Sequence, residues 1–209
     1  MRRGVTVLLK ADAGELEGLL DFLRAAERLK ETERHAWTSG GRRESVAEHT
    51  WRLCLMAMLV ADEYPDLDFP RFIRMCIVHD LGEAISGDVP APEQEDAPGK
   101  SERERRDLQT LVRPLAARQR ESIVGLWEGY EAGRTPEARL AKALDKLETI
   151  LQHTQGDNPP GFDYRFNLDY GHRYTSDDPL ILLLRELLDV ETERRAVAAE
   201  NAGGDDGSR

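Results

Sequence analysis

The chain has few cysteines, no long hydrophobic run and a deficit of positive charge. Two cysteines in 209 residues make no disulfide framework. Cys54 and Cys76 each lie in an apolar helical pattern, where a reduced cysteine packs as a small hydrophobic residue. No stretch approaches the roughly 20 apolar residues that span a bilayer, and the patch from Val5 to Leu9 is shorter than a signal-peptide core. These absences predict a cytoplasmic protein that does not enter a membrane.

The formal net charge of −11 argues against an extended nucleic acid as partner, because such binding needs a basic surface. A small anionic ligand needs only a few local cations, and Arg34, Arg42 and Arg43 precede His49 closely enough to supply them. The length fits one domain of about 100–200 residues. A hydrophobic content of 40% is enough for a core.

The hydrophobic pattern is helical throughout, and no segment shows the alternation typical of a β-strand. Ser45 with Glu48 three residues later has the spacing of a helix-capping box. Helices are expected at about 15–30, 45–63, 70–81, 101–130 with an interruption near Pro114, 136–154 and 179–199. Loops are expected at 31–43, 84–99 and 156–178, the last covering one edge of a cleft. The sequence predicts a single all-α domain over residues 1–198 and a disordered tail over 199–209.

Four polar residues stand in or beside these apolar helices. They are His49 in ESVAEHTWRL, the doublet His79-Asp80 in MCIVHDLGEAISGD, and Asp145 in AKALDKLETI. A buried polar side chain is costly without a partner, and one divalent cation would be a partner common to all four. Two imidazoles and two carboxylates suit Mn²⁺, Co²⁺, Fe²⁺ or Zn²⁺. The pattern predicts one metal ion held by side chains from three helices, which is typical of a hydrolytic centre.

This H…HD…D order resembles that of the HD-domain phosphohydrolases. More narrowly, the segments ESVAEHTWRL, IVHDLGEAISGD and LDKLE resemble the HD-domain 5′-deoxynucleotidases, over residues 29–153. The resemblance implies a compact helical fold, a homodimer, and removal of the phosphate from deoxynucleoside 5′-monophosphates. It also implies that His49, His79, Asp80 and Asp145 bind the metal.

The same resemblance implies roles for three further residues: Glu83 is catalytic, Asp88 contributes to substrate binding and Arg34 orients the phosphate. From the residues themselves, Glu83 either handles protons near the metal or is a solvated carboxylate at a helix end. Asp88 either accepts a hydrogen bond from a sugar hydroxyl or caps a turn, and Arg34 either clamps phosphate or lies on the surface.

One position departs from the family pattern. Family members have tryptophan after the arginine, whereas His35 follows Arg34 here and Trp37 comes two residues later. Trp37 either stacks on a base or packs the loop. Selectivity for deoxyribose is therefore open.

Several rival functions are weighed by the same motifs. Two-metal HD enzymes have additional histidines between the doublet and the final aspartate, and none occurs from Leu81 to Leu144. This argues against a dinuclear oxygenase or a cyclic-dinucleotide phosphodiesterase. Guanosine-tetraphosphate hydrolases have an adjacent Glu-Asp pair after the doublet, whereas Ala84 follows Glu83 here. A phosphatase for another small phosphomonoester and a non-catalytic nucleotide sensor remain as alternatives. Retention of Glu83 beside all four predicted ligands favours an enzyme.

Overall fold

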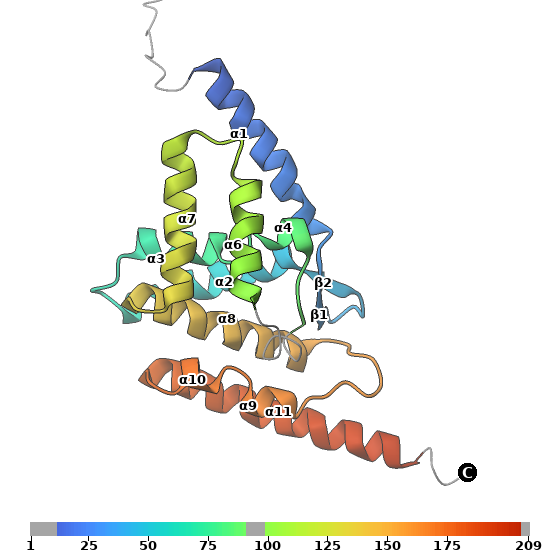
Figure 1. Cartoon of the computed structure of the whole chain (residues 1–209). Helices are drawn as coiled ribbons and strands as arrows, with labels where there is room; N and C mark the ends of the chain where they lie inside the picture. The colour runs from blue at the N-terminus through green and yellow to red at the C-terminus, as the bar shows by residue number, and fades with distance from the viewer. Residues whose placement is uncertain (1–11, 91–98, 206–209) are drawn as a thin grey trace, which may run out of the picture.

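Helices dominate the structure, a computed structural model that describes residues 12–90 and 99–205 (Figure 1). The longer helices are α1 (Ala13–Ala26), α2 (Val46–Val60), α3 (Phe69–Val78), α6 (Lys100–Leu111), α7 (Ala117–Ala132), α8 (Pro136–Gln155) and α11 (Pro179–Asp205). Short helical turns are η1 (Glu27–Lys30), η2 (Ala61–Glu63), α4 (Glu83–Ser86), α9 (Phe166–Asp169) and α10 (His172–Thr175). Strands β1 (Glu33–Trp37) and β2 (Arg43–Ser45) form one antiparallel pair. The predicted all-α class is confirmed.

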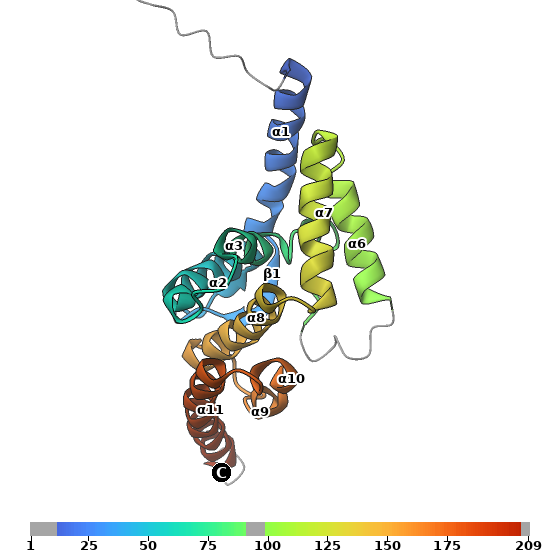
Figure 2. The same cartoon turned by 90° about the vertical axis from the view of Figure 1, so that its left-hand side faces the viewer.

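Helix α8 is the central element. It lies between the α2–α3 pair and α11 in both views, and it packs against all three and α7 (Figures 1 and 2). Its Leu144 and Leu147 are fully buried in one core with Leu53 of α2, Phe72 of α3 and Ile181 of α11. Side chains from α2, α3 and α8 therefore meet at the middle of the molecule.

A second core joins the upper elements in Figure 1, where α6 and α7 stand beside α4 and η1. It contains Leu29, Val78, Leu108 and Trp127. This core holds the chain that follows α3, because Leu81 and Ala84 belong to the same cluster.

The predicted helix over 70–81 ends earlier than expected. Helix α3 ends at Val78, and the His79-Asp80 doublet lies in a turn before α4. The turn has i→i+3 bonds, with the Glu83 N–H donating to the Asp80 carbonyl at 3.0 Å. Gly82 lies against α6, where a Cβ atom would be 2.8 Å from the Glu104 carbonyl oxygen. Close packing on α6 thus turns the chain at the doublet.

A β-hairpin forms where the sequence predicts a loop over 31–43. The Thr38 N–H donates to the Arg42 carbonyl at 2.8 Å, and Gly41 has a φ of +79° in the turn. The hairpin packs on the C-terminal end of α8, whose Gln152 side chain donates to the Trp37 carbonyl. Ala36 is only 1% exposed. Tertiary packing on α8 decides this pairing, which is why local alternation does not reveal it.

The expected helices at 101–130 and 136–154 are confirmed, with the break near Pro114. The expected loop over 156–178 contains α9 and α10, which the sequence did not predict. Arg185 of α11, 2% exposed, donates to the carbonyls of Asn167 and Tyr170 at 2.8 Å each. A buried guanidinium therefore ties this segment to the molecule.

The last helix is longer than predicted. Helix α11 extends to Asp205, beyond the expected end near residue 199, and the disordered tail stays a prediction. The Arg165 Nε donates to Glu200 Oε1 at 2.6 Å, which anchors the end of the helix to the preceding segment. Residues 206–209 lie outside the described residues, as do 91–98 of the expected loop at 84–99. The domain boundary at residue 198 stays a prediction.

Within the described ranges, no helix has both the length and the apolar character that crossing a membrane demands.

Candidate metal centre and substrate cavity

Side chains of His49, His79, Asp80 and Asp145 converge on one buried point. His49 comes from α2, the doublet from the turn after α3, and Asp145 from α8. The two Nε2 atoms are 3.3 Å apart, and His49 Nε2 lies 3.2 Å from Asp145 Oδ1. His79 Nε2 lies 2.9 Å from Asp80 Oδ2. The structure thus brings together the four residues that the sequence singled out.

The histidines are oriented as metal ligands would be. His79 Nδ1 is 2.8 Å from the Cys76 carbonyl, which fixes a proton on Nδ1, and His49 Nδ1 contacts Glu148 Oε2. When both rings are neutral with the proton on Nδ1, as metal ligands must be, each Nε2 turns a lone pair toward the other. Two neutral imidazoles in this arrangement leave room for a cation and not for a mutual hydrogen bond. The buried cluster is therefore able to bind a divalent metal.

Asp145 is held by its second oxygen. Oδ1 faces the histidines, while Oδ2 accepts a hydrogen bond from the Tyr130 hydroxyl at 2.9 Å and lies 3.0 Å from Lys146 Nζ. Burial opposes the charged carboxylate, but Lys146 and the histidines outweigh it and hold the pKa of Asp145 well below its usual range. Asp145 is consequently an ionised group whose Oδ1 faces the two histidines.

Charges in the metal-free site also act on His49. Burial and the charge of Arg34 lower the pKa of His49, but Glu148 and Asp145 outweigh them and raise it to about 9. A cation would displace this proton, since a histidine ligand must be neutral at the ligating nitrogen.

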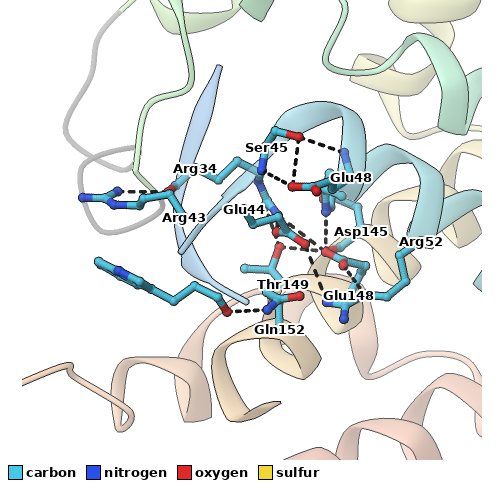
Figure 3. Close-up of polar contacts among 12 residues, drawn as sticks. Arg34, Arg43, Glu44, Ser45, Glu48, Arg52, Asp145, Glu148, Thr149 and Gln152 are labelled. Atoms are coloured by element: carbon cyan, nitrogen blue, oxygen red, sulfur yellow. Dashed lines mark hydrogen bonds and ion pairs between the residues drawn. The ribbon is translucent and has the colours of Figure 1, made fainter. Parts of the chain in front are cut away.

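Two glutamates and two arginines, Glu44, Glu148, Arg34 and Arg52, form a polar network (Figure 3), and Glu148 joins it to His49. Arg34 Nη1 donates to Glu44 Oε2 at 2.9 Å and lies 3.5 Å from Glu148 Oε2, while Nη2 donates to Thr149 Oγ1 at 3.0 Å. Arg52 Nε donates to Glu148 Oε1 at 2.7 Å. The network joins β1, β2, α2 and α8, and it satisfies buried charges that would be costly alone.

Glu83 is a buried acid with an unused oxygen. The residue is 6% exposed, and Oε2 has no hydrogen-bond partner among the described residues. Burial, with the charges of Asp80 and Asp88, raises the pKa of Glu83 well above its usual range. The burial rules out a solvated carboxylate, and the raised pKa favours the protonated form of the side chain.

Arg34 and Asp88 line the same small cavity. Other lining residues are His35, Ala36, Thr149, His153, Phe162, Asp163, Phe166 and Tyr170. Arg34 is not a surface arginine, since its side chain is only 11% exposed. Burial raises the pKa of Asp88 although Arg34 opposes the shift. The segment over 156–178 forms one wall of the cavity, as predicted for the edge of a cleft.

Aromatic rings form that wall. His35 and Phe162 stack at 6.2 Å with 16° between their planes, and both line the cavity. Trp37 packs edge-on against Phe162 at 5.9 Å, and the Arg43 guanidinium lies 4.4 Å above its ring. Among the described residues Trp37 is not part of the lining, so it packs the hairpin, and His35 lies nearer the cavity.

A family model described as "HD domain" matches residues 26–181, which is most of the chain. The chain belongs to the HD-domain family. A relative from Mus musculus, named 5′-deoxynucleotidase HDDC2, is 33% identical over 194 residues, covering 90% of this chain and 94% of the relative. A relative from Schizosaccharomyces pombe, named 5′-deoxynucleotidase hdd1, is 32% identical over 147 residues, 68% of this chain and 73% of the relative.

A solved structure has a similar fold over most of the chain. The crystal structure titled as a predicted metal-dependent phosphohydrolase from Magnetospirillum magnetotacticum MS-1 has a TM-score of 0.76 at 29% sequence identity. The similarity covers 87% of this chain and 94% of that chain. The two chains thus share a fold over most of their lengths.

Sequence reasoning missed five residues around this HD-domain site. They are Glu44, Arg52, Tyr130, Lys146 and Glu148. Glu148 and Arg52 were available as charges at i+3 from Asp145 and His49, the spacing that puts two residues on one helix face. Tyr130 has no comparable signal, because only the packing of α7 against α8 brings it to Asp145.

Proposed function

We propose that this chain is a metal-dependent phosphohydrolase that removes the 5′-phosphate from deoxynucleoside 5′-monophosphates. The observation that carries the proposal is the approach of two histidine Nε2 atoms to 3.3 Å beside Asp145 and Asp80. The substrate class is supported by relatives named 5′-deoxynucleotidase that align with up to 90% of this chain.

The proposed ligands of one divalent cation are His49, His79, Asp80 and Asp145. Imidazole nitrogen with carboxylate oxygen suits Mn²⁺, Co²⁺, Fe²⁺ or Zn²⁺. When bound there, such a cation supplies Lewis-acid polarisation of a phosphoryl oxygen and lowers the pKa of a coordinated water.

The chain's own groups account for phosphate binding and proton transfer. Arg34 has its Nε–H and one Nη2–H left over from the contacts described above, so it can donate to a phosphate in the cavity. The buried acid Glu83 handles protons, either by orienting the attacking water or by giving a proton to the departing 5′-oxygen. The P–O5′ bond breaks, and the products are inorganic phosphate and a deoxynucleoside.

Asp88 lines the same cavity as Arg34 and is proposed to accept a hydrogen bond from a sugar hydroxyl. His35 and Phe162, which line the cavity, are placed to contact the sugar or the base. Whether they disfavour the ribose 2′-hydroxyl is part of the test.

Release of phosphate from a panel of nucleotides tests the proposal. The purified chain is loaded with Mn²⁺ or Co²⁺ and given deoxynucleoside 5′-monophosphates. Ribonucleoside 5′-monophosphates, deoxynucleoside 3′-monophosphates and a sugar phosphate serve as comparisons. We expect phosphate release to be fastest from the deoxynucleoside 5′-monophosphates and to stop after chelation of the metal.

Two other results would redirect the assignment. Faster hydrolysis of the sugar phosphate would favour a phosphatase for another small phosphomonoester. Tight nucleotide binding without phosphate release from any compound would favour a sensor. The homodimer implied by the family, and a cytoplasmic location, stay predictions.

A further inference from the structure

Glu148 touches a proposed metal ligand and the proposed phosphate-binding arginine with the same oxygen. Its side chain is fully buried, Oε2 contacts His49 Nδ1, and Arg34 Nη1 lies 3.5 Å from that oxygen. The other oxygen, Oε1, accepts from Arg52 Nε at 2.7 Å. The hydrogen-bond partners described for this carboxylate, His49, Arg34 and Arg52, all act as donors.

A second metal site does not explain the arrangement. Oxygens of Glu44 and Glu148 do come within 4.8 Å of each other and of a His49 nitrogen. However, Arg34 and Arg52 lie against both carboxylates and supply their positive charge. A dication added to this group would meet two buried guanidinium charges, so the carboxylates serve to orient side chains.

We propose that Glu148 is a positioning residue that keeps the His49 proton on Nδ1 and aims Arg34 into the cavity. Nε2 of His49 is then held toward the metal point, and the guanidinium toward the phosphate. This inference rests on the function proposed above. It predicts that one buried carboxylate links metal affinity to phosphate binding.

Glu148→Gln separates this role from packing, because glutamine has nearly the same shape. Its amide carries one acceptor and one donor group, whereas His49, Arg34 and Arg52 all donate. Either orientation of the amide sets an N–H group against a donor. With the amide nitrogen toward His49, the ring must accept at Nδ1 and its proton moves to Nε2, where it opposes the metal.

Glu44→Gln is the matched control. Glu44 is 3% exposed and contacts Arg34 at 2.9 Å, but it has no hydrogen bond to His49 among the described contacts. We expect Glu44→Gln to raise KM while leaving metal affinity within about threefold of wild type. We expect Glu148→Gln to raise KM too and to weaken Mn²⁺ binding roughly 10–100-fold, the usual loss for the partner of a histidine ligand.

Titration of the metal-free chain with Mn²⁺ against a chromophoric chelator measures the affinity, and KM is measured at saturating Mn²⁺. Equal Mn²⁺ affinity in Glu148→Gln and wild type overturns the inference, as does an equal loss in Glu44→Gln. If Glu148→Gln does not fold, Glu148→Asp decides, because the shorter side chain withdraws the carboxylate from His49: weakened Mn²⁺ binding supports the role, and wild-type binding overturns it. A wild-type chain that binds Mn²⁺ but hydrolyses nothing instead contradicts the proposed function alone.

Discussion

Each of three proposed metal ligands is held in place by a different kind of neighbour. His79 is fixed by a backbone carbonyl, His49 by Glu148, and Asp145 by Tyr130 with Lys146. Such outer partners fix ring orientation and tautomer before any metal arrives. Glu83 differs from all of these, because one of its oxygens has no partner in the described structure. An unsatisfied buried oxygen is destabilising, so its presence here points to use during the reaction.

Replacing Glu83 by glutamine removes the proton-transfer group while keeping its size. We expect kcat to fall by about 10²–10⁴, the usual contribution of a positioned acid or base, with metal content unchanged. Steady-state phosphate release and elemental analysis of the purified variant measure the two quantities.

Glu104→Gln is the comparison, since Glu104 is also partly buried near Glu83 but pairs with Lys100 at 3.3 Å. We expect it to retain wild-type turnover. Turnover of Glu83→Gln at the wild-type rate would exclude the role.

At the scale of elements, the site depends on where helices begin and end. Helix α2 starts with a complete capping box, in which the Ser45 hydroxyl accepts from the Glu48 N–H and Glu48 Oε2 accepts from the Ser45 N–H. The cap residue lies one turn before His49 and is the last residue of β2. It therefore sets the entry of the chain into the helix that carries the first ligand.

Ser45→Ala removes the side-chain cap. We expect the free energy of unfolding to fall by about 1 kcal/mol, since one backbone N–H loses its acceptor. Urea unfolding of the metal-free chain measures this. Ser39→Ala, in the exposed hairpin turn, is the control and should change stability by less than about 0.5 kcal/mol. An equal effect of both substitutions would show that the cap contributes nothing specific.

At the scale of the whole molecule, the proposed metal joins three separate segments. The ligands come from α2, from the turn after α3 and from α8, and these elements also share one hydrophobic core. A ligand that binds only the folded chain stabilises it according to its concentration and affinity. Metal removal should therefore affect global stability as well as activity.

Chelation is expected to lower the unfolding temperature. At a free metal concentration 100 times Kd, binding contributes about 2.7 kcal/mol, which corresponds to roughly 5–10 °C for a chain of this size. Thermal unfolding with chelator and after re-addition of Mn²⁺ measures the shift. Asp145→Asn is the control and should respond to Mn²⁺ much less. An unfolding temperature independent of metal in the wild type would argue against a site formed only in the folded state.

Helix pattern and ligand candidates were predictable because each has a local signal. Apolar spacing indicates the helices, and Ser45 with Glu48 indicates the start of α2. The hairpin was not predictable, since Trp37 pairs through its carbonyl with Gln152 of α8. The end of α3 at Val78 was also missed, because the turn depends on the contact of Gly82 with α6.

By itself, the sequence determined the helical class and which polar residues stand in apolar surroundings, since both depend on periodicity along the chain. Only the tertiary structure decided that His49 and His79 meet Asp145 with both Nε2 atoms toward one point. It also decided that Glu148 and Arg34 lie behind them, 114 residues apart along the chain. Orientation of the His49 ring depends on the partner of its Nδ1 atom, and that partner, Glu148, comes from a distant helix.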